Sequence, residues 1–313
     1  MNETTTYPDY SVCRLCPREC GVNRAGGGRG VCGATAELRI ASWGPHMGEE
    51  PCFTGRRGSG TIFFAGCPCH CLFCQNGKLP APGAQPPSAR GVGFFGGDLG
   101  LIRRGFHILI FGPRELYCPH IEALGARLRD DGVKIPFLFN SSGYLLPAMI
   151  PRYAKLMDIF MPDFKFADSA LARAVMRDER YPERARESLR LMVAEKGFLE
   201  PFDPTGANPA RQGVLVRHLV LPGHVDNTRR ALDWLREEFG RWLPLSLMSQ
   251  YQPTPAARRQ PPFDRPLARH EYDLAVEHAE NLGFENILIQ PAPISDDFFP
   301  DFSRRKPFKG NPD

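Results

Sequence analysis

From about residue 60 onward, short apolar runs alternate with segments that have the periodicity of amphipathic helices. The apolar runs lack a polar–apolar alternation, which is typical of parallel strands buried on both faces. The expected strands cover residues 61–65, 107–111, 136–140, 158–161, 214–221, 245–249 and 286–290. The expected helices cover 119–131, 182–196, 227–239 and 266–282, the third capped by Asn227. This order predicts an α/β fold whose parallel strands form a partial or full (βα) barrel.

Polar or sulfur-containing residues come directly after several of the expected strands. In chain order they are Cys67, then Asn140 to Ser142, then Asp163 with Lys165, then Gln250 with Tyr251. Parallel barrels place the carboxyl ends of their strands at one mouth, where the chemistry of such folds is found. We therefore expect these side chains to meet at one site.

Arg217 lies inside an apolar run, where an unpaired charge would be costly. It is expected to face a polar cavity or a carboxylate, or else to reach solvent from an edge strand. The neighbouring His218 points to the opposite face and is expected to be a hydrogen-bonded structural residue.

Three regions can be distinguished along the chain. Residues 1–59 are rich in Cys and Gly and are expected to form a small appended module. Residues 60–295 contain the barrel pattern, and residues 296–313 form a C-terminal tail. Within the barrel region, residues 77–93 are rich in Pro and Gly and are expected to form a loop.

Composition excludes several classes of protein. The 313 residues include 39 basic and 35 acidic side chains, for a net charge of +4, and the basic residues form no dense block. No nucleic-acid partner is therefore expected. No apolar run is long enough to span a bilayer, and residues 1–10 do not resemble a signal peptide. We expect a cytoplasmic protein without a membrane partner.

The ten cysteines are concentrated in two groups. Four lie between residues 67 and 74, and four more lie between residues 13 and 32. Disulfides are the alternative for an even number of cysteines, but the cytoplasmic expectation argues against them. Thiols this crowded favour a shared metal or cluster. Cys52 and Cys118 stand alone and are expected to be buried thiols.

The central group contains Cys67, Cys71 and Cys74 in a C-x3-C-x2-C pattern. Three thiolates on a [4Fe-4S] cluster leave one iron without a protein ligand. In radical S-adenosylmethionine (SAM) enzymes that iron binds SAM, whose reductive cleavage gives a 5′-deoxyadenosyl radical. The alternative is a structural zinc site that uses four of Cys67, Cys69, His70, Cys71 and Cys74.

Longer motifs accompany these cysteines in a fixed order from residue 13 to about residue 253. They read CRLCPRECGVNR, GRGVCGA, GSGTIFFAGC, FCQN, NSSGY, PDFKFAD, VRHLVLPG and SLMSQYQP. In these motifs the chain resembles radical SAM proteins of the pyruvate formate-lyase activating enzyme type. It is most similar to their long-chain relatives with an N-terminal cysteine module.

The resemblance implies a radical SAM barrel, a site for SAM and a hydrogen-abstraction reaction. It implies SAM contacts for Asn140, Ser142, Asp163, Lys165, Arg217 and Gln250. It also implies an electron donor such as flavodoxin or ferredoxin, and a glycine Cα of a glycyl-radical enzyme as substrate. Taken alone, Asp163 and Lys165 would be interpreted as an exposed ion pair of little energetic value, and their place after a buried strand favours a functional role instead.

The chain departs from its relatives at two places. Residues 112–115 read Gly-Pro-Arg-Glu, whereas relatives have a different short motif there that binds the amine of SAM. Residues 77–105 are rich in Gly and Pro, whereas relatives have a regular first helix in this region. Two other functions therefore stay open. One is radical modification of another peptide or a small molecule, and the other is a non-catalytic iron–sulfur or zinc protein.

The N-terminal group has the spacing C-x2-C-x3-C-x11-C over Cys13, Cys16, Cys20 and Cys32. Four thiolates would saturate zinc or a closed iron–sulfur cluster, and either would stabilise a module that lacks a core. Free thiols are the alternative. The arginines beside these cysteines are expected to be solvated or to face an acidic partner: Arg14, Arg18, Arg24 and Arg29.

Overall fold

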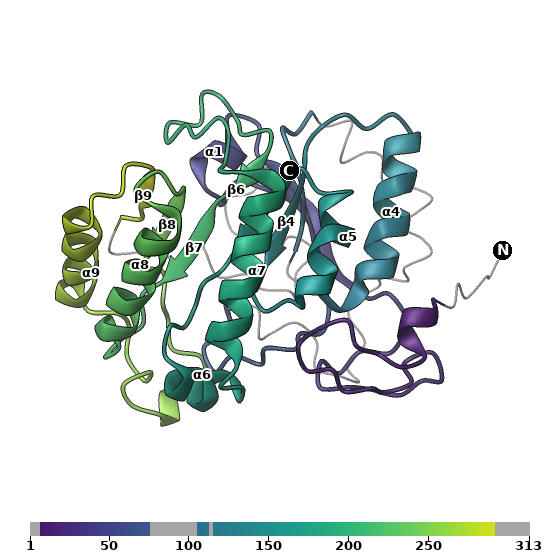
Figure 1. Cartoon of the computed structure of the whole chain (residues 1–313), viewed down its shortest axis with the longest axis horizontal. Helices are drawn as coiled ribbons and strands as arrows, with labels where there is room; N and C mark the ends of the chain where they lie inside the picture. The colour runs from purple at the N-terminus through teal and green to yellow at the C-terminus, as the bar shows by residue number, and fades with distance from the viewer. Residues whose placement is uncertain (1–6, 76–104, 113–114, 292–313) are drawn as a thin grey trace.

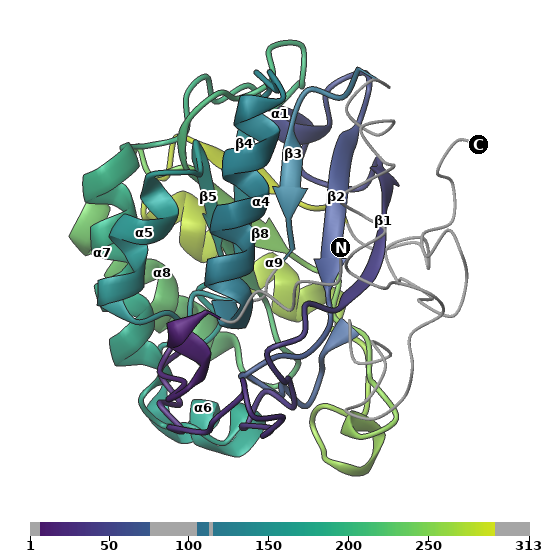
Figure 2. The same cartoon turned by 90° about the vertical axis from the view of Figure 1, so that its right-hand side faces the viewer.

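The computed structural model describes residues 7–75, 105–112 and 115–291. Its strands form a six-stranded sheet in the order β1-β2-β3-β4-β5-β6 and a three-stranded sheet in the order β7-β8-β9. All neighbouring strands are parallel except β1 and β2 (Figures 1 and 2). The strands are β1 (Ile40–His46), β2 (Ser59–Phe64), β3 (Leu109–Phe111), β4 (Phe137–Ser141), β5 (Ile159–Pro162), β6 (Gly213–Val214), β7 (Val216–Leu219), β8 (Leu245–Met248) and β9 (Ile287–Ile289).

A parallel bridge between Asp163 and Arg217 joins the two sheets. It places β7 beside the end of β5, so that the strand order continues from β5 into the smaller sheet. Within the described residues, β1 and β9 are the outer strands and do not pair with each other. The expected parallel α/β architecture is confirmed, and the barrel is not closed within the described residues.

Helices pack against the outer face of the sheets, as Figure 1 shows for α4, α5, α7 and α8. The longer helices are α4 (Cys118–Asp130), α6 (Ser169–Met176), α7 (Tyr181–Lys196), α8 (Val225–Phe239) and α9 (Arg269–Asn281). Short helical segments are η1 (Pro8–Tyr10), α1 (Pro51–Thr54), η3 (Glu115–Tyr117), η4 (Pro147–Met149), α5 (Ile150–Ala154) and η5 (Ala257–Arg259). In α8 the buried residues Thr228, Ala231, Leu232 and Leu235 share one face, as a helix on a core requires.

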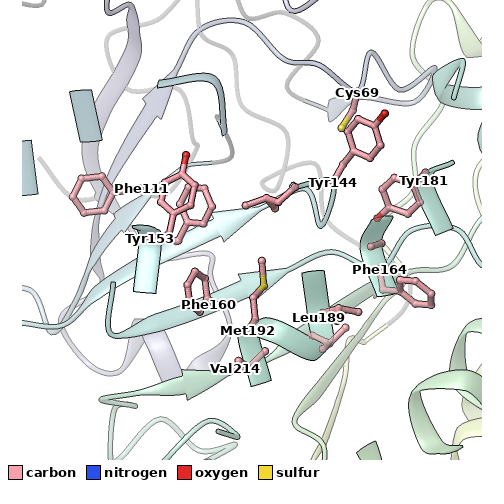
Figure 3. Packing of buried hydrophobic residues seen from close by; sticks show 14 of the residues in the cluster. Cys69, Phe111, Tyr144, Tyr153, Phe160, Phe164, Tyr181, Leu189, Met192 and Val214 are labelled. Carbon is pink, nitrogen blue, oxygen red and sulfur yellow. The ribbon is translucent and has the colours of Figure 1, made fainter. Parts of the chain in front are cut away.

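The sheet has two apolar faces. Between sheet and helices lies the main core, where Figure 3 shows Phe111 toward one end and Tyr144 and Tyr181 toward the other. On the inner face a smaller cluster includes Ile110, Leu138 and Phe53, the last from α1. The helix α1 therefore packs against the inner face of the strands.

Most expected elements agree with the structure to within a few residues. The expected strand at 214–221 instead divides into β6 and β7, which belong to different sheets. The capping role expected for Asn227 is wrong, because α8 begins at Val225 and the Asn227 side chain bonds to other backbone groups. The expected loop at 77–93 and the tail at 296–313 lie outside the described residues.

Strand β1 is an element that the alternation did not predict. It comes from the Cys- and Gly-rich region and pairs antiparallel with β2 along its length. Gly44 and Pro45 within it obscure the strand pattern in the sequence. Among the described helices, none has both the length and the apolar character needed to cross a bilayer.

Candidate active site at the carboxyl ends of the strands

The loop with Cys67, Cys71 and Cys74 leaves the end of β2 through Gly66, whose φ of +88° favours glycine. Hydrogen bonds fix both sides of this loop. The Cys67 amide donates to the Cys32 carbonyl at 3.3 Å, and the Leu72 amide donates to the Val175 carbonyl at 3.0 Å. The Leu72 carbonyl in turn accepts from Thr254 at 2.7 Å. The loop is therefore held by three segments that are distant in the sequence.

The thiols of this loop lie close together. The Cys69 amide donates to the Cys67 sulfur at 3.4 Å. The Cys69 thiol makes hydrogen bonds with the side chains of Cys67 and Cys71. The bond with Cys67 lowers the pKa of Cys69, but the bond with Cys71 and burial outweigh it and raise that pKa well above its usual value. All ten cysteines lie in the described part of the chain, and none forms a disulfide. The disulfide alternative is therefore not supported.

Zinc would require at least three ligands within bonding distance of one ion. In the described ranges, no three side chains of His, Cys, Asp or Glu are grouped in this way. A four-iron cluster spreads its thiolates over separate irons, so its ligands need not converge on one point.

Asn140, Asp163 and Lys165 meet at one place, as expected from their positions near the strand ends, and Arg217 from within β7 joins them. The Arg217 guanidinium donates to Asp163 Oδ1 at 3.0 Å and to Asn140 Oδ1 at 2.9 Å. Lys165 Nζ bonds to Asp163 Oδ2. Burial by itself raises the pKa of Asp163, but Lys165 and Arg217 outweigh it and lower that pKa.

The alternative of an exposed ion pair for Asp163 and Lys165 is wrong. Their side chains are only 14% and 18% exposed. A charged pair that is mostly removed from water needs further partners, and Arg217 provides one.

Two glutamates complete this cluster, and the sequence did not reveal them. Arg217 Nη1 lies 3.3 Å from Glu49 Oε2 and 4.0 Å from Glu50 Oε2. Both glutamates lie between β1 and α1, and burial raises the pKa of each. Arg217 thus faces carboxylates, as its position in an apolar strand predicted. No local pattern marks Glu49, because its partner is 168 residues away.

His218, next to Arg217, is a structural residue as expected. Its Nδ1 lies 2.6 Å from the Phe164 carbonyl, and its Nε2 lies 3.0 Å from Thr228 Oγ1. Burial lowers the pKa of His218 to about 4, which keeps the ring neutral at pH 7.

Ser142 lies against a second buried carboxylate, that of Glu115. Glu115 Oε1 accepts from the Ser142 amide at 2.9 Å and from its hydroxyl at 2.6 Å. Glu115 Oε2 is buried and has no hydrogen-bond partner within the described residues. Residues 113 and 114, which precede it, lie outside the described part of the chain. Glu115 is thus a buried acid at the same edge of the sheet as Ser142.

Tyr181 ties the loops after β4 and β5 to each other, and the sequence gave no indication of this role. Its hydroxyl lies 3.0 Å from the Ser142 carbonyl and 2.8 Å from the Asp163 carbonyl, and it accepts from the Lys165 amide at 2.9 Å. Gly143 fits between these loops because it has no side chain. A Cβ on Gly143 would lie 2.0 Å from the Asp163 carbonyl oxygen.

Gln250 and Tyr251 also lie at this edge. The Gln250 carbonyl accepts from the Gln75 side chain, which follows Cys74. The Tyr251 ring packs against Phe73 of the cysteine loop, with ring centroids 5.8 Å apart. The loop after β8 is therefore in direct contact with the cysteine loop.

The N-terminal cysteines lie next to the central loop. Cys13, Cys16 and Cys32 are buried, while Cys20 is exposed. Burial raises the pKa of Cys16 to about 12, and the nearby Cys32 and Cys13 thiols add to this. The Cys32 carbonyl is the acceptor for the Cys67 amide, so the two groups are direct neighbours. Cys52 and Cys118 are buried, as expected.

The expectation that the arginines of this module are solvated is wrong for two of them. Arg24 is fully buried, donates to the carbonyls of Leu116 and Thr35 at 2.7 and 2.8 Å, and lies over the Tyr10 ring. The Arg18 side chain is 11% exposed and bonds to the Pro68 carbonyl at 2.9 Å. Both arginines satisfy carbonyls that come from distant parts of the chain.

Comparison with known proteins gives distant matches. No protein-family model matches the chain. An uncharacterized protein of Methanocaldococcus jannaschii is 25% identical over 301 residues, covering 89% of this chain and 77% of that protein. Among solved structures, methylornithine synthase (PylB) is similar with a TM-score of 0.41 and 13% identity, covering 74% of this chain and 70% of that one.

Proposed function

We propose that the chain is a radical SAM enzyme in which Cys67, Cys71 and Cys74 hold a [4Fe-4S] cluster. The observation that supports this best is the position of the cysteine loop. It follows β2 and contacts Gln250, which follows β8, at the carboxyl ends of the parallel strands. This is the edge at which barrel enzymes assemble their sites from several strands.

The chemistry of the cysteine loop fits such a cluster. It offers unbridged thiols, which are the preferred ligands of iron–sulfur clusters. Reduced thiols also fit the cytoplasmic location proposed from the sequence.

A bound, reduced cluster would supply one electron to SAM and so break a C–S bond of its sulfonium, giving methionine and a 5′-deoxyadenosyl radical. That radical would abstract a hydrogen atom from the substrate. We assign Asn140, Ser142, Asp163, Lys165 and Gln250 to SAM binding. Lys165 and Asp163 offer one charge of each sign, matching the carboxylate and ammonium of an amino acid. We also assign Arg217 to this site, in an indirect role. The Arg217 guanidinium donates a hydrogen bond to Asp163 and so holds the Asp163 carboxylate in position.

As substrate we propose a glycine Cα of a partner glycyl-radical enzyme. This assignment is supported by the sequence motifs alone. A backbone Cα can be reached only if a loop of the partner enters the site, so the partner would have to present a flexible segment.

The function is tested with protein that has been reconstituted anaerobically with iron and sulfide. Dithionite and SAM are added, and 5′-deoxyadenosine is measured. We expect product in proportion to SAM consumed. A protein that binds iron but forms no 5′-deoxyadenosine would contradict the proposal and leave a non-catalytic iron–sulfur protein. Product without a glycyl radical signal in candidate partners would contradict the proposed substrate only.

We also propose a second metal centre at Cys13, Cys16, Cys20 and Cys32. Three of these thiols, those of Cys13, Cys16 and Cys32, are buried, and Arg24 Nη1 lies 3.6 Å from the Cys13 sulfur. A chain with Cys67, Cys71 and Cys74 all replaced by Ser isolates this centre. We expect that chain to retain metal after reconstitution, and metal-free protein would contradict the assignment.

A further inference from the structure

A group of arginines surrounds a hollow of about 350 Å³ where α6 meets α7. We call this group the arginine patch, and it consists of Arg18, Arg173, Arg177 and Arg180. Asp178 and Glu179 line the same hollow. Four positive charges against two negative ones leave an excess of two.

The two carboxylates differ in how much of this charge they neutralise. The Asp178 side chain is 5% exposed and forms ion pairs with Arg18 at 3.3 Å and with Arg180 at 3.0 Å. Glu179 meets Arg173 at 3.3 Å, but both side chains are mostly exposed, at 61% and 75%. An exposed pair of this kind is weak and can exchange partners at little cost. Arg173 is therefore accessible to another protein.

Arg177 is accessible for a different reason. It ends α6 in the left-handed conformation, with φ of +59° and ψ of +35°. Glycine is the usual residue there, because an L-residue is disfavoured in that region. Its side chain is exposed and makes no ion pair or hydrogen bond that the described residues reveal. Arg177 therefore adds an exposed positive charge at the end of α6.

The arginine patch is attached directly to the cysteine loop. Arg18 donates to the Pro68 carbonyl at 2.9 Å within that loop, and to the Met176 carbonyl at 2.6 Å at the end of α6. The amide of Leu72 bonds to Val175, one residue earlier. Figures 1 and 2 both show α6 beside the N-terminal module, at the same end of the molecule. A protein bound at the patch would therefore lie close to Pro68 and Leu72, which directly follow Cys67 and Cys71 in the chain.

We propose that the arginine patch is the docking surface for an acidic one-electron carrier protein. This proposal rests on the proposed function. The carrier loses one electron and is oxidised, while the cluster at Cys67, Cys71 and Cys74 gains that electron and is reduced. Complementary charge steers such a carrier to the patch and sets the rate of encounter.

The test uses flavodoxin as the probe carrier and two reversals of charge in one chain, Arg173→Glu with Arg177→Glu. Neither residue binds the cysteine loop. The control chain has Arg127→Glu with Arg241→Glu, which are exposed arginines on α4 and after α8. Both control positions lie toward the amino ends of the following strands, at the opposite end of the sheet. Each chain is assayed for 5′-deoxyadenosine with reduced flavodoxin and, separately, with dithionite.

We expect the KM for flavodoxin to rise roughly tenfold or more in the patch variant, because docking would place like charges together. The rate with dithionite should stay at the wild-type level in both variants. Calorimetric titration of flavodoxin into each chain should show the same loss of affinity in the patch variant alone. Equal KM and equal affinity for flavodoxin in the wild type and the patch variant would overturn the proposal. A wild-type chain inactive with dithionite would instead overturn the proposed function.

Discussion

The backbone amide of Cys67 donates a hydrogen bond to the carbonyl of Cys32 at 3.3 Å. This bond joins the first residue of the central motif to the last cysteine of the N-terminal group. Gly66 reinforces the contact, since a Cβ there would lie 3.1 Å from the same carbonyl. The N-terminal module therefore packs directly against the start of the cysteine loop and helps to hold it in place.

Arg24 should contribute strongly to the stability of the N-terminal module. Replacing it as Arg24→Met leaves the Leu116 and Thr35 carbonyls buried without donors, so we expect a loss of about 3 kcal/mol in the free energy of unfolding. Urea denaturation measures this loss. Arg14→Met, at an exposed position, is the matched control and should change stability by less than about 0.5 kcal/mol. Similar losses in the two variants would show that Arg24 is not structural.

Gly143 should tolerate no side chain. In Gly143→Ala the new Cβ meets the Asp163 carbonyl at 2.0 Å, and we expect a loss of more than about 3 kcal/mol as the loops after β4 and β5 separate. Gly132→Ala is the control, because its φ is +84° but no atom lies within 4 Å of the new Cβ. It should cost only about 1–2 kcal/mol. Thermal unfolding measures the loss of stability in both variants. Equal losses would contradict the expected clash between the new Cβ of Gly143→Ala and the Asp163 carbonyl.

Arg217 should stabilise the cluster of carboxylates that surrounds it. Arg217→Met leaves Asp163 and Glu49 buried without their shared cation, so we expect a loss of about 3–5 kcal/mol at pH 7. Arg190→Met removes an exposed ion pair with Glu238 and should cost less than about 1 kcal/mol. The loss at Arg217 should shrink as pH falls, because the unpaired carboxyls can then take up protons. A loss that does not depend on pH would contradict this account.

The free energy of unfolding at low pH should depend measurably on the ionisation of Glu271. The Glu271 carboxylate accepts from Arg265 at 2.7 and 2.9 Å and from the Gly223 amide at 2.6 Å. The bonds from Arg265 are the main reason that its pKa is lowered to about 2. The stabilisation is present above about pH 4, where the carboxyl of the unfolded chain is also ionised, and is lost as pH falls toward 2.

The variant Glu271→Gln should therefore lower the free energy of unfolding by about 1.5–3 kcal/mol at pH 7. Its difference from the wild type should narrow below about pH 4. Urea denaturation at several pH values follows both effects. Glu277→Gln, on an exposed face of α9, should show neither effect, and a narrowing there would point to a general change in surface charge.

The strand-end residues could be predicted because their positions follow from local sequence. Buried parallel strands are apolar throughout, so the residues that follow each run lie at the sheet edge. This rule placed Asp163 and Gln250 correctly, whereas Asn140 lies within β4 itself, near its carboxyl end. Partners that lie far away in sequence leave no such pattern. Glu49 reaches Arg217 from the turn between β1 and α1, and buried Arg24 finds its acceptors in the carbonyls of Thr35 and Leu116.

Local preference was also overridden in two places. Asn227 is a good cap for a helix, but its amide instead bonds to Lys165 and Ala167, which connects α8 to the loop after β5. The long apolar run at 214–221 looks like one strand, yet Leu215 separates two short strands of different sheets. In both cases contacts between distant segments decide the outcome.

The most direct test of the account compares single replacements within the cysteine loop. Cys67→Ser, Cys71→Ser, Cys74→Ser and Cys69→Ser chains are reconstituted, reduced with dithionite, and studied by electron paramagnetic resonance with and without SAM. We predict that the first three lose the cluster signal that responds to SAM, while Cys69→Ser keeps it. Retention of that signal without Cys67, Cys71 or Cys74, or its loss only without Cys69, would contradict the account.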